Sequence, residues 1–133
     1  MQTFLDQTMI PISPRRITAE ERDLLIAALE RAPVATFVAG NLGETIPELM
    51  VIGRCECGCA SVTFSPQGEG ISDMVADGLA TDPTGESVGL ILWARHGRFT
   101  ELEIVGHSDV PAGLPSAISV RSYEEEGRRM SQA

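Results

Sequence analysis

The sequence predicts a single α+β domain, in which a four-stranded, mainly antiparallel sheet of two hairpins carries an N-terminal amphipathic helix on one face. Apolar residues recur at helical spacing in segment 18–31. Two pairs of β-type apolar segments, 49–55 with 60–65 and 88–95 with 99–105, are each joined by a connection that contains glycine. A chain of 133 residues also has room for one core and needs no disulfides to hold it.

The helix at 18–31 has both a start and a stop signal. Thr18-Ala19-Glu20-Glu21 matches a capping box, in which the threonine hydroxyl and the second glutamate each accept an amide at the helix start. Pro33 ends the pattern, because proline cannot continue a helix. Before the helix, Pro11 and Pro14 disfavour helical structure, so we expect residues 1–16 to form an extended arm or an edge strand.

The connecting segments are harder to assign. Residues 34–42 fit either a helical stripe or a strand, with Gly40 interrupting both. Residues 66–87 are rich in Gly, Asp, Pro and Ser and predict a long loop with at most one helical turn, at 72–79. Near the C-terminus we expect a short strand at 117–121 and a frayed tail over 124–133.

The second hairpin is expected to turn tightly at His96-Gly97. That turn would place Ile91 opposite Leu102 and Trp93 opposite Thr100. Strand 88–95 is apolar on both faces, which predicts a central strand with both faces at least partly covered. A single helix covers one face, so the other would be covered by segment 34–42, by the long loop or by a second copy in a homodimer.

Composition excludes several partners. The formal charge is −9, and all ten Lys+Arg cations are arginine. Such a chain repels nucleic acid and anionic membranes, so we expect neither as a partner. The negative charge either serves solubility, which we favour, or attracts a basic protein partner. The longest apolar runs, Leu24 to Leu29 and Leu90 to Ala94, are too short to cross a bilayer. The segment from Met1 to Ile10 lacks the basic start of a signal peptide, which predicts a cytoplasmic protein.

The three cysteines, Cys55, Cys57 and Cys59, lie within five residues. They provide soft donors for zinc, with His96 or His107 as the fourth ligand. One intervening residue between cysteines is unusual for zinc, however. A hairpin tip at Cys57-Gly58 would send the sulfurs to different sides, where they could not share a metal. Structural or incidental thiols, a zinc site and a redox pair are the three interpretations, and we favour the first.

Other motifs predict no active site. Gly85-Glu86-Ser87-Val88-Gly89 has the letters of a nucleophile elbow, but a turn precedes it and a strand follows. His107-Ser108-Asp109 places triad residue types side by side, where they cannot converge. Glu101 and Glu103 share one face of a strand, and we expect that face to be exposed.

The motifs resemble those of a group of small uncharacterised bacterial proteins. The shared pieces are the helix start at Arg15 to Glu21, a Cys-x-Cys-Gly-Cys-x-Ser-Val stretch at 55–62, and a late hairpin at Arg98 to Glu103. The resemblance covers about half of the chain in three pieces and implies no established activity, so it transfers no catalytic residue.

We therefore expect a non-enzymatic protein-interaction module, such as an inhibitor of the immunity type that binds a basic protein. The alternative is a zinc-binding protein that uses Cys55, Cys57 and Cys59. An enzyme of unknown reaction is the third hypothesis, since no catalytic set assembles in the sequence.

Overall fold

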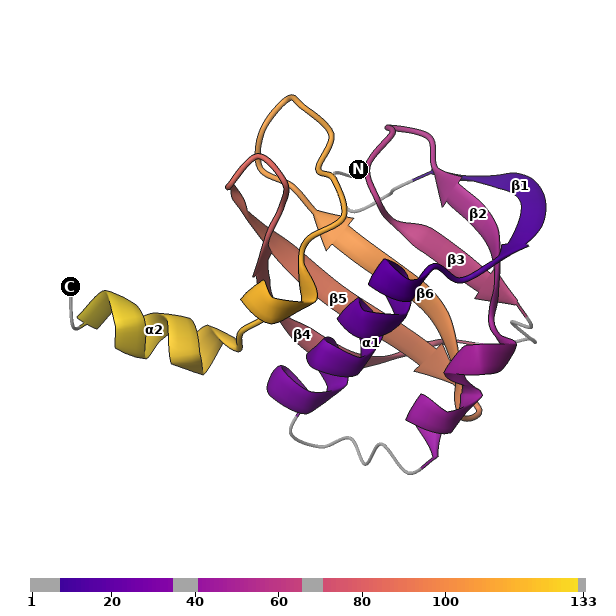
Figure 1. Ribbon diagram of the computed structural model, residues 1–133, viewed down its shortest axis with the longest axis horizontal. Helices are drawn as coiled ribbons and strands as arrows, with labels where there is room; N and C mark the ends of the chain where they lie inside the picture. Colours follow the sequence, from indigo (N-terminus) through magenta and orange to yellow (C-terminus); the bar gives the residue numbers. More distant parts are fainter. Residues whose placement is uncertain (1–7, 35–40, 66–70, 132–133) are drawn as a thin grey trace.

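The computed structural model describes residues 8–34, 41–65 and 71–131. These residues form one six-stranded antiparallel sheet with strand order β1-β2-β3-β6-β5-β4, and helix α1 lies across one face of it (Figure 1). The α+β class is confirmed, but the expected number of four strands is wrong. The strands are β1 (Met9–Arg16), β2 (Met50–Cys55), β3 (Val62–Ser65), β4 (Asp73–Thr81), β5 (Ser87–Arg95) and β6 (Arg98–Val105). The helices are α1 (Ala19–Arg31) and α2 (Tyr123–Ser131), with 3-10 helices η1 (Leu42–Glu48) and η2 (Ala117–Ser119).

From residue 8 to residue 31 the structure agrees with the sequence-based prediction, and residues 1–7 of the expected arm lie outside the described residues. β1 is an edge strand, and the capping box is present: the Glu21 amide donates to Thr18 Oγ1 at 3.0 Å, and the Thr18 amide donates to Glu21 Oε1 at 2.9 Å. Arg15 adds two hydrogen bonds to the same carboxylate, at 2.9 and 3.0 Å. Burial opposes ionisation of Glu21, but these donors hold its pKa below its ordinary value. The ion pair of Arg15 with Glu21 therefore fixes the end of β1 to the first turn of α1.

The core lies between α1 and the covered face of the sheet. Leu24, Leu25 and Ala28 of the helix are fully buried there, together with Leu42 and Ile46 of η1. Segment 34–42 was ambiguous in the sequence, and most of it lies outside the described residues. Among the described residues, no helix is long and apolar enough to cross a membrane.

The predicted long loop at 66–87, with a helical turn at 72–79, is wrong in its central part. Residues 73–81 form β4, and residues 66–70 lie outside the described part of the chain. Asp73, Asp77 and Gly78 are weak strand formers, and for this reason the residue pattern did not predict a strand here. β4 is held instead by its tertiary partners: it pairs with β5 along one side, and its other side is partly covered by backbone from two distant segments.

Those two segments close the outer edge of β4. The amide of Asp77 donates to the Ala32 carbonyl at 2.9 Å, and Leu79 and Arg121 exchange two backbone hydrogen bonds at 2.9 Å. Gly78 is required at this crossing, because a Cβ atom there would lie 2.6 Å from the Arg121 carbonyl oxygen. The end of α1 and the segment before α2 therefore pack directly on this strand.

The hairpin of β5 and β6 turns where expected but in a different register. His96 and Gly97 both have positive φ, 52° and 78°, as a tight hairpin turn requires. A bulge at Thr100 then shifts the pairing by one residue, so Leu92 lies opposite Leu102 and Trp93 opposite Glu101. The expected pairs of Ile91 with Leu102 and Trp93 with Thr100 are therefore wrong.

The bulge assigns the residues of β6 to the two faces of the sheet, because a one-residue slip reverses every side chain. Leu102 and Ile104 are fully buried in the core, whereas Glu101 and Glu103 lie on the opposite face, which we call the outer face. β5 lies second from the edge of the sheet and is not its central strand. Its outer-face residues Ile91 and Trp93 are half-buried.

The C-terminal segment is also more ordered than the sequence indicates. Residues 117–121 form η2 and a single bridge to β4 in place of the expected strand. Most of the expected frayed tail is helical, in α2, which projects away from the sheet (Figure 1). Arg121 is buried and donates to Glu126 Oε1 at 2.7 Å and to Ser87 Oγ at 3.0 Å. It thereby connects the start of α2 to the start of β5.

Candidate thiol site

The three cysteines lie at the end of β2 and in the loop that leads to β3. Cys55 is the last residue of β2, and its amide donates to the Ser61 carbonyl at 3.3 Å, so the hairpin closes around five intervening residues. Inside the loop, the amide of Gly58 donates to the Cys55 carbonyl at 3.1 Å, and Gly58 has a φ of 93°. Positive φ at glycine lets the chain turn back within this short distance.

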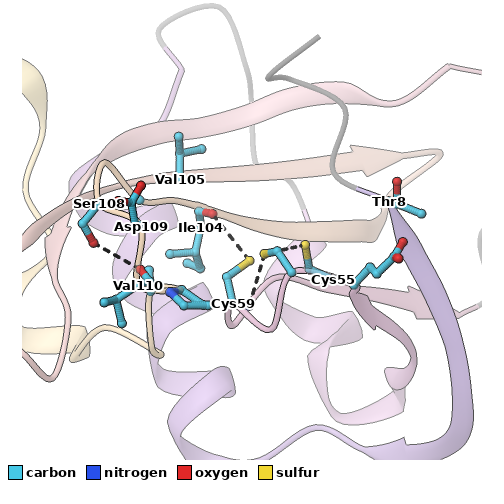
Figure 2. Close-up of a pocket in the computed structure, with 13 residues that line it drawn as sticks. Thr8, Cys55, Cys59, Ile104, Val105, Ser108, Asp109 and Val110 are labelled. Carbon is cyan, nitrogen blue, oxygen red and sulfur yellow. Dashed lines mark hydrogen bonds between the residues drawn. The ribbon is translucent and has the colours of Figure 1, made fainter. Parts of the chain in front are cut away.

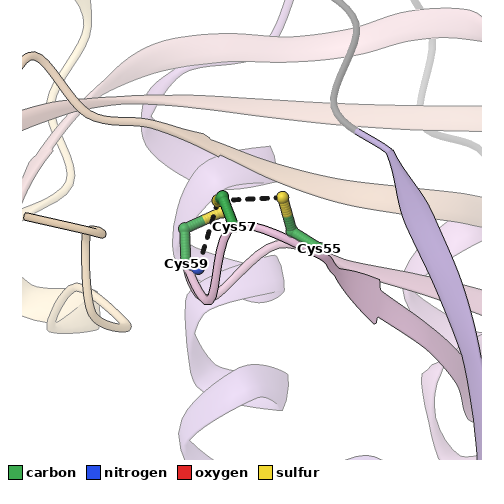
Figure 3. Close-up of side chains that lie close together, drawn as sticks. All are labelled: Cys55, Cys57 and Cys59. Atoms are coloured by element: carbon green, nitrogen blue, oxygen red, sulfur yellow. Dashed lines mark hydrogen bonds between the residues drawn. The ribbon is translucent and has the colours of Figure 1, made fainter. Parts of the chain in front are cut away.

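This turn brings the three sulfurs together (Figure 3). All three Sγ atoms lie within 4.8 Å of one another. Cys55 Sγ and Cys57 Sγ are 2.9 Å apart, and the Cys59 amide donates to Cys57 Sγ at 3.3 Å. The alternative of a hairpin tip at Cys57-Gly58, with the sulfurs on different sides, is therefore wrong.

The cysteines differ in exposure and protonation. Cys55 is buried, and burial together with its hydrogen bond to Cys57 raises its pKa to about 12. Cys57 is exposed, and although desolvation opposes ionisation, hydrogen bonds from Cys55 and from the Cys59 amide lower its pKa. The cluster thus combines a buried thiol that resists ionisation with an exposed thiol whose pKa is lowered.

Ser61 anchors this loop to β6. Its side chain is fully buried; its Oγ accepts from the Ile104 amide at 2.8 Å and lies 3.3 Å from the Ile104 carbonyl oxygen, to which it donates. Cys59 Sγ in turn donates to Ser61 Oγ at 3.3 Å. The third cysteine is therefore held toward the end of β6.

A pocket of about 630 Å³ opens beside the sulfurs (Figure 2). It is bordered by Thr8, by the cysteine loop, by the end of β6 and by segment 108–112. Its charged side chains are Glu56 and Asp109, and no basic residue is among the described residues that line it. The pocket is therefore an acidic cavity with thiols in its wall.

Neither histidine joins the cluster. His96 lies in the turn before β6, whereas Cys59 Sγ lies 4.0 Å from the Ile104 carbonyl oxygen, near the other end of that strand. His107 is exposed and does not line the pocket. Within the described ranges, no fourth histidine, cysteine or carboxylate ligand atom joins the three sulfurs within 4.8 Å. A fourth ligand from another residue would therefore have to move toward the three sulfurs to share an ion with them.

The other sequence motifs remain separate from the thiols. Ser87 begins β5, and its Oγ accepts a hydrogen bond from Arg121. This contact connects two segments of the fold and does not activate a nucleophile. Ser108 Oγ donates to the Val110 carbonyl at 3.2 Å, so it does not engage its neighbours in a triad.

The outer face holds a second unusual group of residues. Trp93 Nε1 donates to Glu103 Oε1 at 2.9 Å. Glu101 lies beside them, and burial together with the charge of Glu103 raises its pKa to about 7. The sequence identified this carboxylate pair, but the expectation of an exposed face is wrong, since both side chains are half-buried.

Comparison with known proteins gives no assignment. No protein-family model matches the chain, and no significant match was found among curated proteins or among solved structures.

Proposed function

We propose that this chain binds a soft divalent metal ion, zinc foremost, through Cys55, Cys57 and Cys59. The observation that carries the proposal is the convergence of the three Sγ atoms within 4.8 Å. Thiolates are preferred zinc ligands, and three from one short loop are already close enough to share an ion after side-chain adjustment.

The required adjustment is small. Tetrahedral zinc with Zn–S bonds of about 2.3 Å separates two sulfur ligands by about 3.8 Å. Cys55 Sγ and Cys57 Sγ are 2.9 Å apart, so they must separate on binding. Cys57 is exposed, which leaves its side chain free to rotate, whereas Cys55 and Cys59 are held by burial and by Ser61.

The three cysteines line the acidic pocket, so we expect a fourth ligand to approach from it. Glu56 and Asp109 line this pocket, and either carboxylate, or water, would complete the coordination. Three protein thiolates with an accessible fourth position would hold an exchangeable metal, in contrast to a closed structural site. His96 is unsuitable because of its place at the opposite end of β6.

Metal analysis tests this proposal. Protein purified without chelator and reconstituted with Zn²⁺ is expected to retain about one ion per chain, and Co²⁺ is expected to give thiolate-to-metal charge-transfer absorption. Cys57→Ser should abolish the charge-transfer band or weaken it strongly. Ser108→Ala, which changes the same pocket without removing a thiol, is the matched control. A folded, reduced protein that retains no zinc after reconstitution contradicts the proposal.

A second function, binding of a basic protein partner as an interaction or inhibitor module, is supported by the outer face. There Ile91 of β5 lies between Asp77 of β4 and Glu103 of β6. Trp93 lies opposite Glu101 of β6. An apolar patch with that charge complements a cationic, partly apolar segment. The formal charge of −9 acts in the same direction over longer distances.

Trp93 is the only tryptophan of the chain and provides the signal for a test. An arginine-rich peptide that contains leucine is expected to change its fluorescence, and Glu101→Gln combined with Glu103→Gln should weaken that binding. Glu30→Gln, on the exposed side of α1, is the control. A salt-sensitive change that is the same in both variants would place the peptide elsewhere. A concentration-dependent dimer with a shielded tryptophan would assign the face to a second copy.

A further inference from the structure

We propose that Cys57 and Cys55 form a dithiol that reduces small cationic disulfides by thiol–disulfide exchange, with Cys57 as the attacking thiol and Cys55 as the resolving thiol. This activity uses two of the sulfurs assigned to the metal, but it belongs to the metal-free, reduced protein and does not depend on metal binding.

The first support is the arrangement of the two sulfurs. Cys55 Sγ and Cys57 Sγ lie 2.9 Å apart, about 0.9 Å more than the length of a disulfide bond, which is about 2.05 Å. The loop therefore already holds the pair close to bonding distance. Cys59 Sγ belongs to the same cluster, but it donates to Ser61 Oγ at 3.3 Å, which holds it toward β6.

The second support is the difference in access. Cys57 is exposed and can meet a disulfide from solution, whereas Cys55 is buried and much less accessible. The Cys59 amide donates to Cys57 Sγ at 3.3 Å, which keeps that sulfur beside Cys55 Sγ. The geometry thus gives the two thiols different roles.

The reaction has two steps. First, the Cys57 thiolate attacks one sulfur of the disulfide; a new S–S bond forms to Cys57, the original S–S bond breaks, and one thiolate leaves and is protonated by water. Second, Cys55 gives its proton to water and attacks Cys57 Sγ, which releases the second thiolate, also protonated by water. The protein loses two electrons to become a disulfide, and the substrate disulfide becomes two thiols.

The pocket selects the substrate by charge. Its lining includes the carboxylates of Glu56 and Asp109, and no basic side chain is found among the described residues around it. A disulfide with ammonium groups is therefore attracted to the sulfurs, and one with carboxylates is repelled. Its volume of about 630 Å³ accommodates a small molecule beside the thiols.

The test uses two reagents of similar size and opposite charge, cystamine and dithiodipropionate, with the reduced, chelator-treated protein. Cystamine is expected to react several-fold faster, and mass mapping after alkylation should place the disulfide between Cys55 and Cys57, with Cys59 alkylated. The same chain unfolded in urea is the control, because there the preference for cystamine should shrink.

Serine variants separate the roles. Cys55→Ser should stop at a cysteamine adduct on Cys57, Cys57→Ser should lose most of the folded-state rate, and Cys59→Ser should still form the disulfide. A disulfide that includes Cys59, or a Cys57→Ser variant that reacts at the wild-type rate, overturns the proposal. Equal rates with both reagents overturn the charge selection.

Zinc loading distinguishes this proposal from the previous one. If both hold, added Zn²⁺ slows the exchange, since the same thiolates bind the metal. Exchange that proceeds as described in a protein that retains no zinc supports the dithiol alone. Zinc retention without disulfide formation in the metal-free protein supports the metal site alone.

Discussion

Replacing Glu101 by glutamine is expected to stabilise the protein at pH 8 and to have a much smaller effect at pH 5. In the folded chain, burial and the charge of Glu103 raise the pKa of Glu101 from an ordinary value of 4.5 to about 7. At pH 8 folding must therefore hold an unfavourable charge on the outer face. Glutamine resembles the protonated side chain and carries no such charge.

The sign and size follow from proton linkage. Between pH 4.5 and pH 7 the folded state binds more protons at this site than the unfolded state, so this group's contribution to stability increases as pH falls through that window. Each pKa unit corresponds to about 1.4 kcal/mol, so the shift sets an upper bound of about 3 kcal/mol. The side chain is partly exposed, and solvent screening reduces the expected gain at pH 8 to about 1–2 kcal/mol.

Urea denaturation followed by far-ultraviolet circular dichroism at both pH values measures this difference without relying on Trp93, which lies beside the substitution. Glu103→Gln should give a smaller gain of the same sign, because it removes the neighbouring charge and keeps an oxygen that accepts from Trp93. Glu30→Gln, exposed on α1, should change neither curve. A Glu101→Gln variant that is less stable than wild type at pH 8, or that gains equally at both pH values, would refute the reasoning.

Three further substitutions test the packing. Gly78→Ala places a Cβ atom 2.6 Å from the Arg121 carbonyl oxygen; overpacking of this kind should cost about 1–3 kcal/mol in urea denaturation, and an unchanged midpoint would mean that β4 is not covered there. Ser61→Ala removes the acceptor at 2.8 Å from the Ile104 amide and should cost about 1–3 kcal/mol; faster hydrogen exchange at the Ile104 amide is the specific sign, and wild-type protection would argue against the anchor. His96→Asn should raise the free energy of unfolding by about 0.5 kcal/mol, and with it the thermal midpoint, because asparagine tolerates the φ of 52° better. A lower thermal midpoint would count against the turn geometry.

The sequence was most informative where local interactions decide the structure. The capping box of Thr18 and Glu21 and the tight turn at His96-Gly97 involve neighbours in the chain, so their residue types predict them. β4 depends on distant partners. Its Asp77 and Gly78 disfavour a strand locally, and pairing with β5 and with the backbone of Ala32 and Arg121 explains why those residues are extended.

The candidate site shows the same division. The sequence identified Cys55, Cys57 and Cys59 as the chemically unusual residues, but the assumption of a two-residue tip predicted divergent sulfurs. The five-residue closure between Cys55 and Ser61 and the positive φ of Gly58 reverse that outcome. Likewise, the bulge at Thr100, which sets the surroundings of Glu101, leaves no signature in residue type alone.

The covered edge of β4 has a consequence for how the molecule behaves at high concentration. An open strand edge is a template on which a second molecule can add its own strand, and repeated addition produces fibrils. At the far side of the sheet, Pro11 and Pro14 interrupt the edge of β1. At β4 the protection of the Leu79–Thr81 end depends on segment 116–121, held by Arg121, remaining in place. Proteolytic removal of the chain after residue 115 would therefore open this end of one edge and let two molecules pair through it, while the edge of β1 remains interrupted.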